Sequence, residues 1–274
     1  YQDSYSPNGI IGEKDACGVG FIANIDGKES NWILEQSLKG LNCMEHRGGC
    51  GGDNDSGDGA GILCSIPWGF LDEDMKLESK PNQIRGLGMI FMPNNDSKVK
   101  ESKLICDEEA KRLNFKKTFW RNVPVKNKIL GKLAKQNAPF ISQWVVCIEK
   151  DGIRDIETLL FQLRKRIEKR IRENTKNAVG DCEFYFASLS SKTVVYKGMV
   201  RSEILSKFYE DLQKKEFKVS FSVYHRRFST NTLPKWPLAQ PMRYLGHNGE
   251  INTLLGNINW AKASEKHIDE YWGE

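Results

Sequence analysis

The sequence contains three clusters of small and polar residues whose side chains can carry out chemistry. Residues 15–20 (DACGVG) form the first cluster, in which Cys17 stands between alanine and glycine. Such small neighbours leave the thiol sterically open, which a cysteine nucleophile needs in order to reach a substrate carbonyl. A small buried residue at the start of a strand fits the same pattern, because free cysteines are often buried. This cluster alone leaves both interpretations open.

The second cluster is a glycine-rich run, residues 45–61 (EHRGGCGGDNDSGDGAG). Its seven glycines permit backbone turns that other residues avoid. The run contains aspartates and lacks the Lys-Ser or Lys-Thr pair of a P-loop, so phosphate binding is disfavoured. Cys43, His46 and Cys50 have a spacing like that of zinc ligands, but a convincing fourth ligand is missing. We therefore expect no metal here, and a loop that packs closely around an active site.

The third cluster, residues 224–252, combines a strand end with a loop rich in proline and tryptophan. Arg226 and Arg227 end the predicted strand, and a paired arginine can hold a carboxylate through two parallel hydrogen bonds. Further along the chain stand Asn248 and Gly249. An asparagine amide beside a glycine N–H supplies two donors for an oxyanion, the charged oxygen that forms when a carbonyl is attacked. An Asn-Gly pair is by itself typical of an ordinary turn, but the combination favours a catalytic site.

Hydrophobic periodicity predicts the elements that position these clusters. We expect strands at residues 17–25, 62–66, 84–92, 141–149, 183–189, 193–196, 218–227 and 242–245. Helices are expected at residues 31–44, 97–113, 155–173, 202–214 and 251–264. The helices come in separated blocks and the strands outnumber them, which favours a layered α+β fold over a doubly wound parallel sheet.

The composition excludes several classes of protein. The 274 residues are 39% hydrophobic and 28% charged, which is typical of an ordinary globular protein. A net charge of +5, spread along the chain, gives little reason to expect a nucleic-acid partner. No apolar run approaches the ~20 residues that a membrane-spanning helix needs. Seven scattered cysteines without a secretory signal favour reduced thiols in an intracellular or organellar compartment.

Six short motifs occur in an order that is found in one enzyme family. They are CGVGF (17–21), HRG (46–48), SGDGAG (56–61), RFSTNT (227–232), WPLAQP (236–241) and GHNGEINT (246–253). From Cys17 to Lys262, the sequence resembles the class II glutamine amidotransferase domain at the N-terminus of glutamate synthases. The residues at 43–61, 65–68 (SIPW) and 195–203 (VYKGMVRSE) are most similar to the ferredoxin-dependent type of plastids and cyanobacteria.

The resemblance implies both the nucleophile and the groups around it. Cys17, as the first residue of the mature chain, would attack the side-chain carboxamide of L-glutamine, with its own α-amino group as general base. That amine titrates at about 7.7–8.0, which suits a base near neutral pH. Asn248 and Gly249 match the oxyanion hole of the family. Arg227 matches the clamp for the substrate α-carboxylate, and Arg47 matches an arginine near the nucleophile.

The resemblance also implies how the chain is organised. Its fold would be α+β, a four-layer αββα sandwich of two antiparallel sheets, as in N-terminal-nucleophile hydrolases. Residues 1–16 resemble a propeptide, and residues 17–274 would be the amidotransferase domain. We expect this domain to be truncated at its C-terminal side, because the family aspartate that binds the α-ammonium group has no counterpart before Glu274. With residues 1–16 attached, the nitrogen of Cys17 is in a peptide bond, so the uncleaved chain should be inactive.

The remaining steps of the implied reaction need domains other than this one, for which we expect no cofactor. In the family, ammonia passes to a barrel domain that carries FMN and an iron–sulfur cluster. There 2-oxoglutarate becomes glutamate with electrons from ferredoxin. The resemblance thus implies L-glutamine as the ligand of this domain, and ferredoxin and 2-oxoglutarate as partners of the others. It also implies the plastid stroma or a cyanobacterial-type cytoplasm as the location.

Two alternatives to this interpretation are open. The chain could belong to another class II amidotransferase, although the WPLAQP loop and the long insert at residues 96–180 argue against it. It could also be an unprocessed, catalytically silent precursor domain with a scaffold role. The retention of Cys17, Arg227 and Asn248 argues against that second alternative.

Overall fold

Two four-stranded antiparallel sheets form the centre of the molecule. The computed structural model describes residues 18–53, 55–174, 184–227, 233–243, 245–246 and 254–272, with side chains in the last range for residues 255–264. The first sheet has the strand order β1 (Val19–Ala23), β8 (Phe221–His225), β2 (Ala60–Ser65) and β7 (Thr193–Gly198). The second has the order β4 (Lys117–Asn122), β5 (Phe140–Glu149), β3 (Gln83–Met92) and β6 (Tyr185–Ser190).

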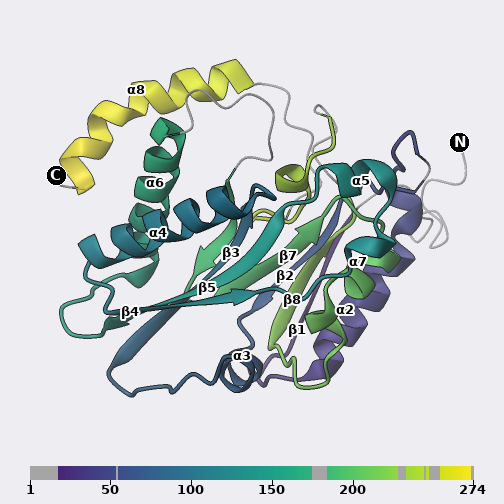
Figure 1. The fold of residues 1–274 in the computed structure, drawn as a ribbon, viewed down its shortest axis with the longest axis horizontal. Coiled ribbons are helices and arrows are strands. Elements are labelled where there is room, and N and C mark those ends of the chain that lie inside the picture. Colours follow the sequence, from purple (N-terminus) through teal and green to yellow (C-terminus); the bar gives the residue numbers. More distant parts are fainter. Residues whose placement is uncertain are drawn as a thin grey trace, which may run out of the picture.

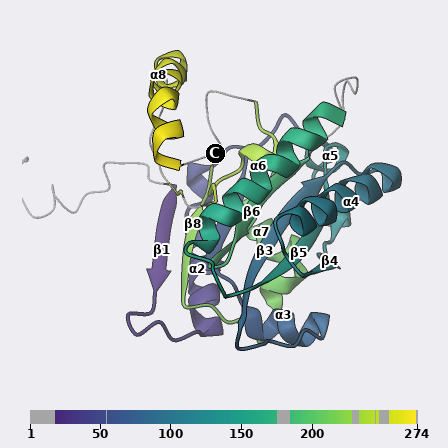
Figure 2. The same ribbon diagram turned by 90° about the vertical axis from the view of Figure 1, so that its left-hand side faces the viewer.

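Helices pack against each of the two sheets (Figure 1). Against the first sheet lie α2 (Asn31–Cys43) and α7 (Ser202–Phe208), and against the second lie α4 (Asp96–Arg112) and α6 (Ile156–Asn174). Figure 2 shows the layers from the side, with β1 at the outer edge of the first sheet. The predicted α+β fold, a sandwich of two antiparallel sheets, is therefore confirmed.

Two hydrophobic cores hold the layers together. Along β3, Met89 and Phe91 face the larger core, which also includes the first sheet and α2. Ile90 and Met92 face the smaller core beneath α4 and α6, because successive strand residues project to opposite faces. The helix predicted at residues 155–173 packs into this smaller core through Leu160, Leu163, Ile167 and Ile171.

The structure differs from the predicted elements in a few short segments. The sequence does not predict α3 (Trp68–Met75), β4 or α5 (Lys132–Gln136). The strand predicted at residues 242–245 is wrong, because a single bridge joins Met242 and Leu245 and Arg243 has a positive φ of 38°. The helix predicted at residues 202–214 ends at Phe208 and is followed by the 3-10 turn η3 (Glu210–Gln213). The last helix, α8 (Leu254–Trp272), extends beyond its predicted end.

Candidate active site

Four strands contribute paired residues to one end of the first sheet, the end at which β1 begins. Val19 of β1 pairs with His225 of β8, and Gly61 of β2 pairs with His225 from the other side. Lys197 of β7 completes the set by pairing with Gly61. We call these four residues the end row. Directly paired residues project from the same face of a sheet, so the end row defines one surface beside the start of β1.

Arg226 follows the end of β8, and its guanidinium group is fully buried. Its Nε and Nη2 atoms donate hydrogen bonds of 3.0 and 2.8 Å to the carboxylate of Glu45. Its Nη1 atom donates to the carboxylate of Asp58 and, at 2.9 Å, to the carbonyl oxygen of Gly59. Burial opposes ionisation of Glu45, but the hydrogen bonds to its carboxylate hold the pKa of Glu45 below its usual value. Arg226 therefore forms an internal salt bridge and is not free to share a substrate carboxylate with Arg227.

The glycine-rich run at residues 45–61 closes around this buried guanidinium. A Cβ atom at Gly48 would lie 1.9 Å from Cζ of Arg226, and one at Gly57 would lie 2.2 Å from the backbone carbonyl carbon of Val200. Neither distance is possible between non-bonded atoms, so these two positions require glycine. The composition of the run thus follows from its close packing against neighbouring segments.

The same loop holds the N-terminus of α5, which lies about 80 residues further along the chain. The carboxylate of Asp53 accepts a hydrogen bond of 2.9 Å from the N–H of Leu133, and Oγ of Ser56 accepts one of 2.9 Å from the N–H of Ala134. Oγ of Ser56 also donates to Asp53 at 2.6 Å. The backbone N–H of Leu133 and the hydroxyl of Ser56 hold the pKa of Asp53 well below its usual range. The loop therefore supplies the helix cap that α5 lacks in its own sequence.

The loop rich in proline and tryptophan contacts both β2 and the end of β8. It contains the 3-10 turn η4 (Trp236–Leu238), in which the buried Trp236 donates through Nε1 to the carbonyl oxygen of Ala134 at 3.0 Å. The N–H of Gln240 donates to the carbonyl oxygen of Arg227 at 3.3 Å. A Cβ atom at Gly61 would lie 2.6 Å from the carbonyl oxygen of Gln240, so the loop lies directly on β2.

The structure describes two of the predicted site residues, Arg227 and Arg47. Arg227 follows β8 and is half-buried. Arg47 is also half-buried and ends the 3-10 turn η1 (Glu45–Arg47). The Arg226 salt bridge connects these two positions, because Arg226 is adjacent to Arg227 and binds a carboxylate of η1. The structure therefore brings both predicted arginines to the same end of the first sheet.

The other predicted site residues, Cys17, Asn248 and Gly249, lie outside the described residues, so their placement stays a prediction. The described residues that lie two positions from Cys17 and from Asn248 in the sequence are close together in the structure. A Cβ atom at Gly246 would lie 3.5 Å from Cγ2 of Val19. The segment that leads to Asn248 therefore packs against the beginning of β1.

Sequence reasoning missed several residues that build this region. Glu45 and Asp58 lie within the glycine-rich run, where their carboxylates gave no sign of pairing with Arg226. Lys197 is fully buried in β7, within the apolar run VVYKGMV (194–200). A single lysine in such a run was an available signal, because lysine is almost never fully buried without a partner.

The structure also shows whether described side chains could hold a metal ion and whether described helices could span a membrane. Within the described parts of the chain, no group of three or more His, Cys, Asp or Glu side chains is placed to hold a metal ion. Cys43 and Cys50, two of the residues with zinc-like spacing, are exposed. None of the described helices is both long and apolar enough to cross a lipid bilayer.

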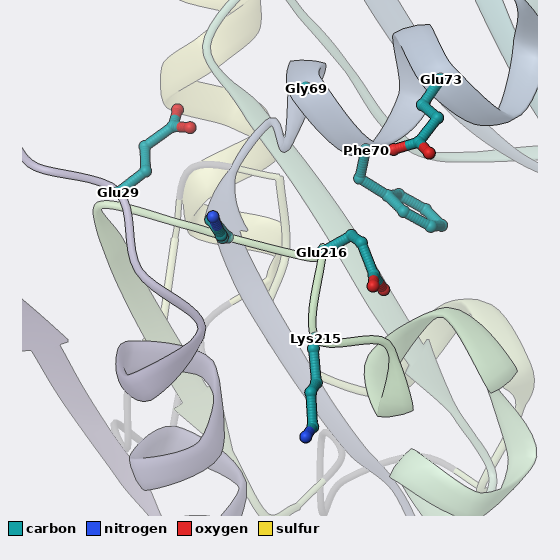
Figure 3. A pocket seen from close by; sticks show the side chains of 7 residues that line it. Glu29, Gly69, Phe70, Glu73, Lys215 and Glu216 are labelled. Carbon is teal, nitrogen blue, oxygen red and sulfur yellow. The ribbon is translucent and has the colours of Figure 1, made fainter.

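A cavity of about 410 Å³ lies at the opposite end of the first sheet (Figure 3). Its lining includes Glu29, which follows β1, Phe70 of α3, which follows β2, and Lys218, which precedes β8. In the antiparallel register these positions belong to the strand ends remote from the end row. The cavity is therefore separate from the candidate active site.

A sandwich of two antiparallel sheets whose first strand begins two residues after a cysteine fits a hydrolase that carries its nucleophile at the start of that strand. A sequence model of the family "Glutamine amidotransferases class-II" matches residues 17–273. The chain therefore belongs to the class II glutamine amidotransferase family, as the resemblance predicted. The matched range begins at Cys17, the predicted nucleophile.

Several ferredoxin-dependent glutamate synthases are similar to this chain. The chain is 50% identical over 257 residues to that of Pyropia yezoensis, with 92% of the chain covered. It is 48% identical over 264 residues to ferredoxin-dependent glutamate synthase 2 of Synechocystis, with 95% covered, and 46% identical over 263 residues to the chloroplastic enzyme of Spinacia oleracea, with 94% covered. In each case the chain spans 16% of the length of the relative.

Proposed function

We propose that this chain is the glutamine-hydrolysing domain of a ferredoxin-dependent glutamate synthase. The family match supports the reaction class, and the identity to these synthases supports the particular type. The structural observation that carries the proposal is the convergence of the start of β1, the end of β8 and Gly246 at one end of the first sheet.

The pairing of β1 with β8 supports the roles of Cys17 and Arg227. Val19 pairs with His225, and the N–H of Arg226 donates to the carbonyl oxygen of Gly18 at 2.7 Å. The same antiparallel register, if continued by one residue, would set position 17 opposite position 227. An arginine there would hold the α-carboxylate of glutamine while the thiol faces its side chain.

The contact between Gly246 and Val19 supports the oxyanion hole. Cys17 is two residues from Val19, and Asn248 is two residues from Gly246. Two residues of extended chain span at most about 7 Å, a length that would let both groups reach one substrate carbonyl. The side-chain amide of Asn248 and the N–H of Gly249 would then donate to the developing oxyanion.

The reaction follows from these groups. The α-amino group of Cys17 accepts the thiol proton, and the thiolate sulfur bonds to the carboxamide carbon of L-glutamine. Asn248 and Gly249 stabilise the resulting oxyanion. The α-ammonium group returns the proton to the amide nitrogen, the C–N bond breaks, and ammonia leaves a glutamyl thioester. Water then hydrolyses the thioester to glutamate and restores the thiol.

This mechanism requires cleavage between residues 16 and 17. An amide nitrogen has no basic lone pair at neutral pH, so Cys17 lacks its general base while residues 1–16 are attached. We therefore propose residues 1–16 as a removable propeptide and residues 17–274 as part of the amidotransferase domain. The intact chain should hydrolyse glutamine only at the background rate.

The ammonia would be used by the remainder of a glutamate synthase. The relatives' dependence on ferredoxin implies FMN and an iron–sulfur cluster, with 2-oxoglutarate as the acceptor of ammonia. The described residues do not fit an iron–sulfur cluster, because Cys64, Cys106 and Cys147 are buried in the hydrophobic cores and the described cysteines form no group. We assign these cofactors to other domains of the protein. By analogy with the chloroplastic and cyanobacterial relatives, we propose a plastid or a cyanobacterial-type cytoplasm as its location.

Ammonia release from glutamine tests the proposed function. In the full-length protein lacking residues 1–16, Cys17→Ala should abolish hydrolysis because no other group replaces the thiolate. Cys43→Ala and Cys50→Ala are the matched controls and should retain most of the activity. Hydrolysis that persists in Cys17→Ala would exclude the proposed nucleophile.

A further inference from the structure

Lys197 and Val19 are the two outermost residues of the end row. Its side chain is fully buried, although β7 is the edge strand of the first sheet. Three strand spacings separate Lys197 from Val19, or about 14 Å. The two residues nevertheless project from the same face of the sheet, because the row is continuous in register.

The amine of Lys197 binds one segment of the loop rich in proline and tryptophan at two places. Its Nζ atom donates to the carbonyl oxygen of Pro237 at 2.7 Å and lies 3.4 Å from Sδ of Met242. It also donates to the hydroxyl of Tyr185 on β6 at 3.1 Å. One atom thus holds both ends of the segment 237–242.

The same segment covers the neighbouring position of the end row, Gly61. Its middle lies on β2, where the carbonyl oxygen of Gln240 occupies the space that a side chain at position 61 would fill. Beyond the segment, Gly246 packs against Val19. The path from Lys197 to Val19 is therefore covered by the chain that leads to Asn248.

The three contacts of the amine are all with neutral groups. Burial lowers the pKa of Lys197 well below its usual value, and the guanidinium of Arg243 lowers it further. The amine therefore acts here through its hydrogen bonds to these groups. Methionine, which is unbranched and of similar length, would remove those hydrogen bonds without leaving a buried charge unpaired.

We propose that Lys197 is a positioning residue for glutamine hydrolysis, which fixes the segment 237–242 against Gly61 of the end row and so places the chain beyond it, with Asn248 and Gly249, against the substrate carbonyl. This proposal rests on the proposed function, in which these two residues form the oxyanion hole. Lys197 contacts the loop and not the substrate, so its effect is exerted through Asn248.

Kinetics of Lys197→Met in the processed, full-length protein test the proposal. Misplaced oxyanion donors act on the transition state, so kcat should fall about 10- to 100-fold while KM for glutamine changes less than about threefold. The matched control is Lys192→Met, an exposed lysine in the connection between β6 and β7, which should change neither constant. A higher KM with an unchanged kcat would overturn the proposal.

A double-mutant cycle with Asn248→Ala identifies the group through which Lys197 acts. If Lys197 positions the Asn248 amide, then Lys197→Met should lower kcat much less in the Asn248→Ala background than in the wild type. Losses that simply multiply would show that Lys197 acts independently of Asn248 and would overturn the proposal.

Hydrogen exchange provides a readout that does not depend on activity. Amides of residues 236–243 should exchange faster in Lys197→Met than in the wild type, and those of α6 should not. Unchanged exchange in this loop would overturn the proposal even if glutamine is hydrolysed. A wild type without glutaminase activity would instead reject the proposed function and leave the loop contact intact. If Lys197→Met does not fold, Lys197→Gln, which is polar but too short to bind both ends of the segment 237–242, must show the same selective loss of kcat.

Discussion

At the scale of single residues, Arg226 should matter far more for stability than a surface arginine. In Arg226→Met, Glu45 and Asp58 lose the partner of their charges, so the free energy of unfolding should fall by about 3 kcal/mol. This value is at the low end for a broken buried pair, because Glu45 is partly exposed. The control is Arg112→Met, whose guanidinium is mostly exposed beside Glu109 and should change stability by less than about 1 kcal/mol. Equal losses in urea unfolding at pH 7 would contradict the internal role of Arg226.

The ionisation of Glu45 should make the stability difference between the wild type and Arg226→Met depend on pH. The pKa of Glu45 is lowered from 4.5 in the folded protein. A lowered carboxyl pKa contributes stability that is fully present above pH 4.5 and is lost as the pH falls through the lower folded value. The stability difference between the wild type and Arg226→Met should therefore shrink below pH 4.5. A difference that grows on acidification would contradict this assignment.

The proposed roles of Asn248 and Arg227 predict different kinetic defects. Asn248→Ala should lower kcat about 10²- to 10³-fold with little change in KM, because the lost donor binds only the oxyanion. Arg227→Lys should mainly raise KM for glutamine, because lysine cannot form two parallel hydrogen bonds to the α-carboxylate. Steady-state glutaminase kinetics on the processed protein distinguish the two, and exchanged patterns would show that the roles are misassigned.

The sequence predicted the candidate site residues through the order of its motifs, but not the contacts that support them. Arg226 and Arg227 look equivalent in sequence, and only the fold shows that Glu45 and Asp58 bind the first of them. The loop that binds Lys197 lies about 40 residues away, so no local pattern indicates its partners. Hydrogen bonds between distant segments are the part of the site that sequence patterns cannot give.

At the scale of elements, the glycine-rich loop and α5 should be stabilised together. Ser56→Ala removes the acceptor for the N–H of Ala134, and loss of a helix cap of this kind costs about 1 kcal/mol. Asp53→Asn should also loosen α5 at pH 7, because a neutral amide is a weaker acceptor. Hydrogen exchange of Leu133 and Ala134 measures both effects, with the exposed Asp55→Asn as control. Unchanged exchange would show that α5 does not depend on the loop.

The Asp53 cap should also weaken in acid. Hydrogen bonds from the backbone and from Ser56 lower the pKa of Asp53 from 3.8, so its stabilising effect is present above that pH and is lost as the pH falls further. The difference in exchange between the wild type and Asp53→Asn should therefore be largest near neutral pH. A difference that is constant down to pH 2 would contradict the ionised cap.

Element prediction succeeded where an element carries its own pattern and failed where it does not. The buried stripe of α6 repeats over five turns of sequence and was predicted within about a residue at each end. The five-residue α5 has no capping side chain at Gly131 and depends on Asp53 and Ser56. The edge strand β4 has mostly polar, exposed residues, and it buries a charged one, Arg121. Both exceptions are stabilised by residues far away in sequence.

At the scale of the whole molecule, polar groups join the layers that the two hydrophobic cores build. Arg121 of β4 donates two hydrogen bonds, of 2.7 and 2.8 Å, to Asp211 of η3, and both side chains are buried. Gln143 of β5 donates to the hydroxyl of Tyr196 on β7 at 2.8 Å, which links the second sheet to the first. Periodicity alone predicted a layered α+β fold, and the order of the layers came from the family resemblance. The polar links could not be predicted, because their members lie on different sheets.

In the proposed mechanism, Cys17 becomes a nucleophile for glutamine only when it is the first residue of the chain. Covalent labelling by a glutamine analogue with an electrophilic carbon in place of the carboxamide carbon can test this requirement. The full-length protein should be treated with and without residues 1–16, and the modified residue located by mass spectrometry. We expect one adduct, on Cys17, in the processed protein and background labelling in the unprocessed one. Labelling of Cys17 at the same rate with residues 1–16 attached, or an adduct on a different cysteine, would contradict it.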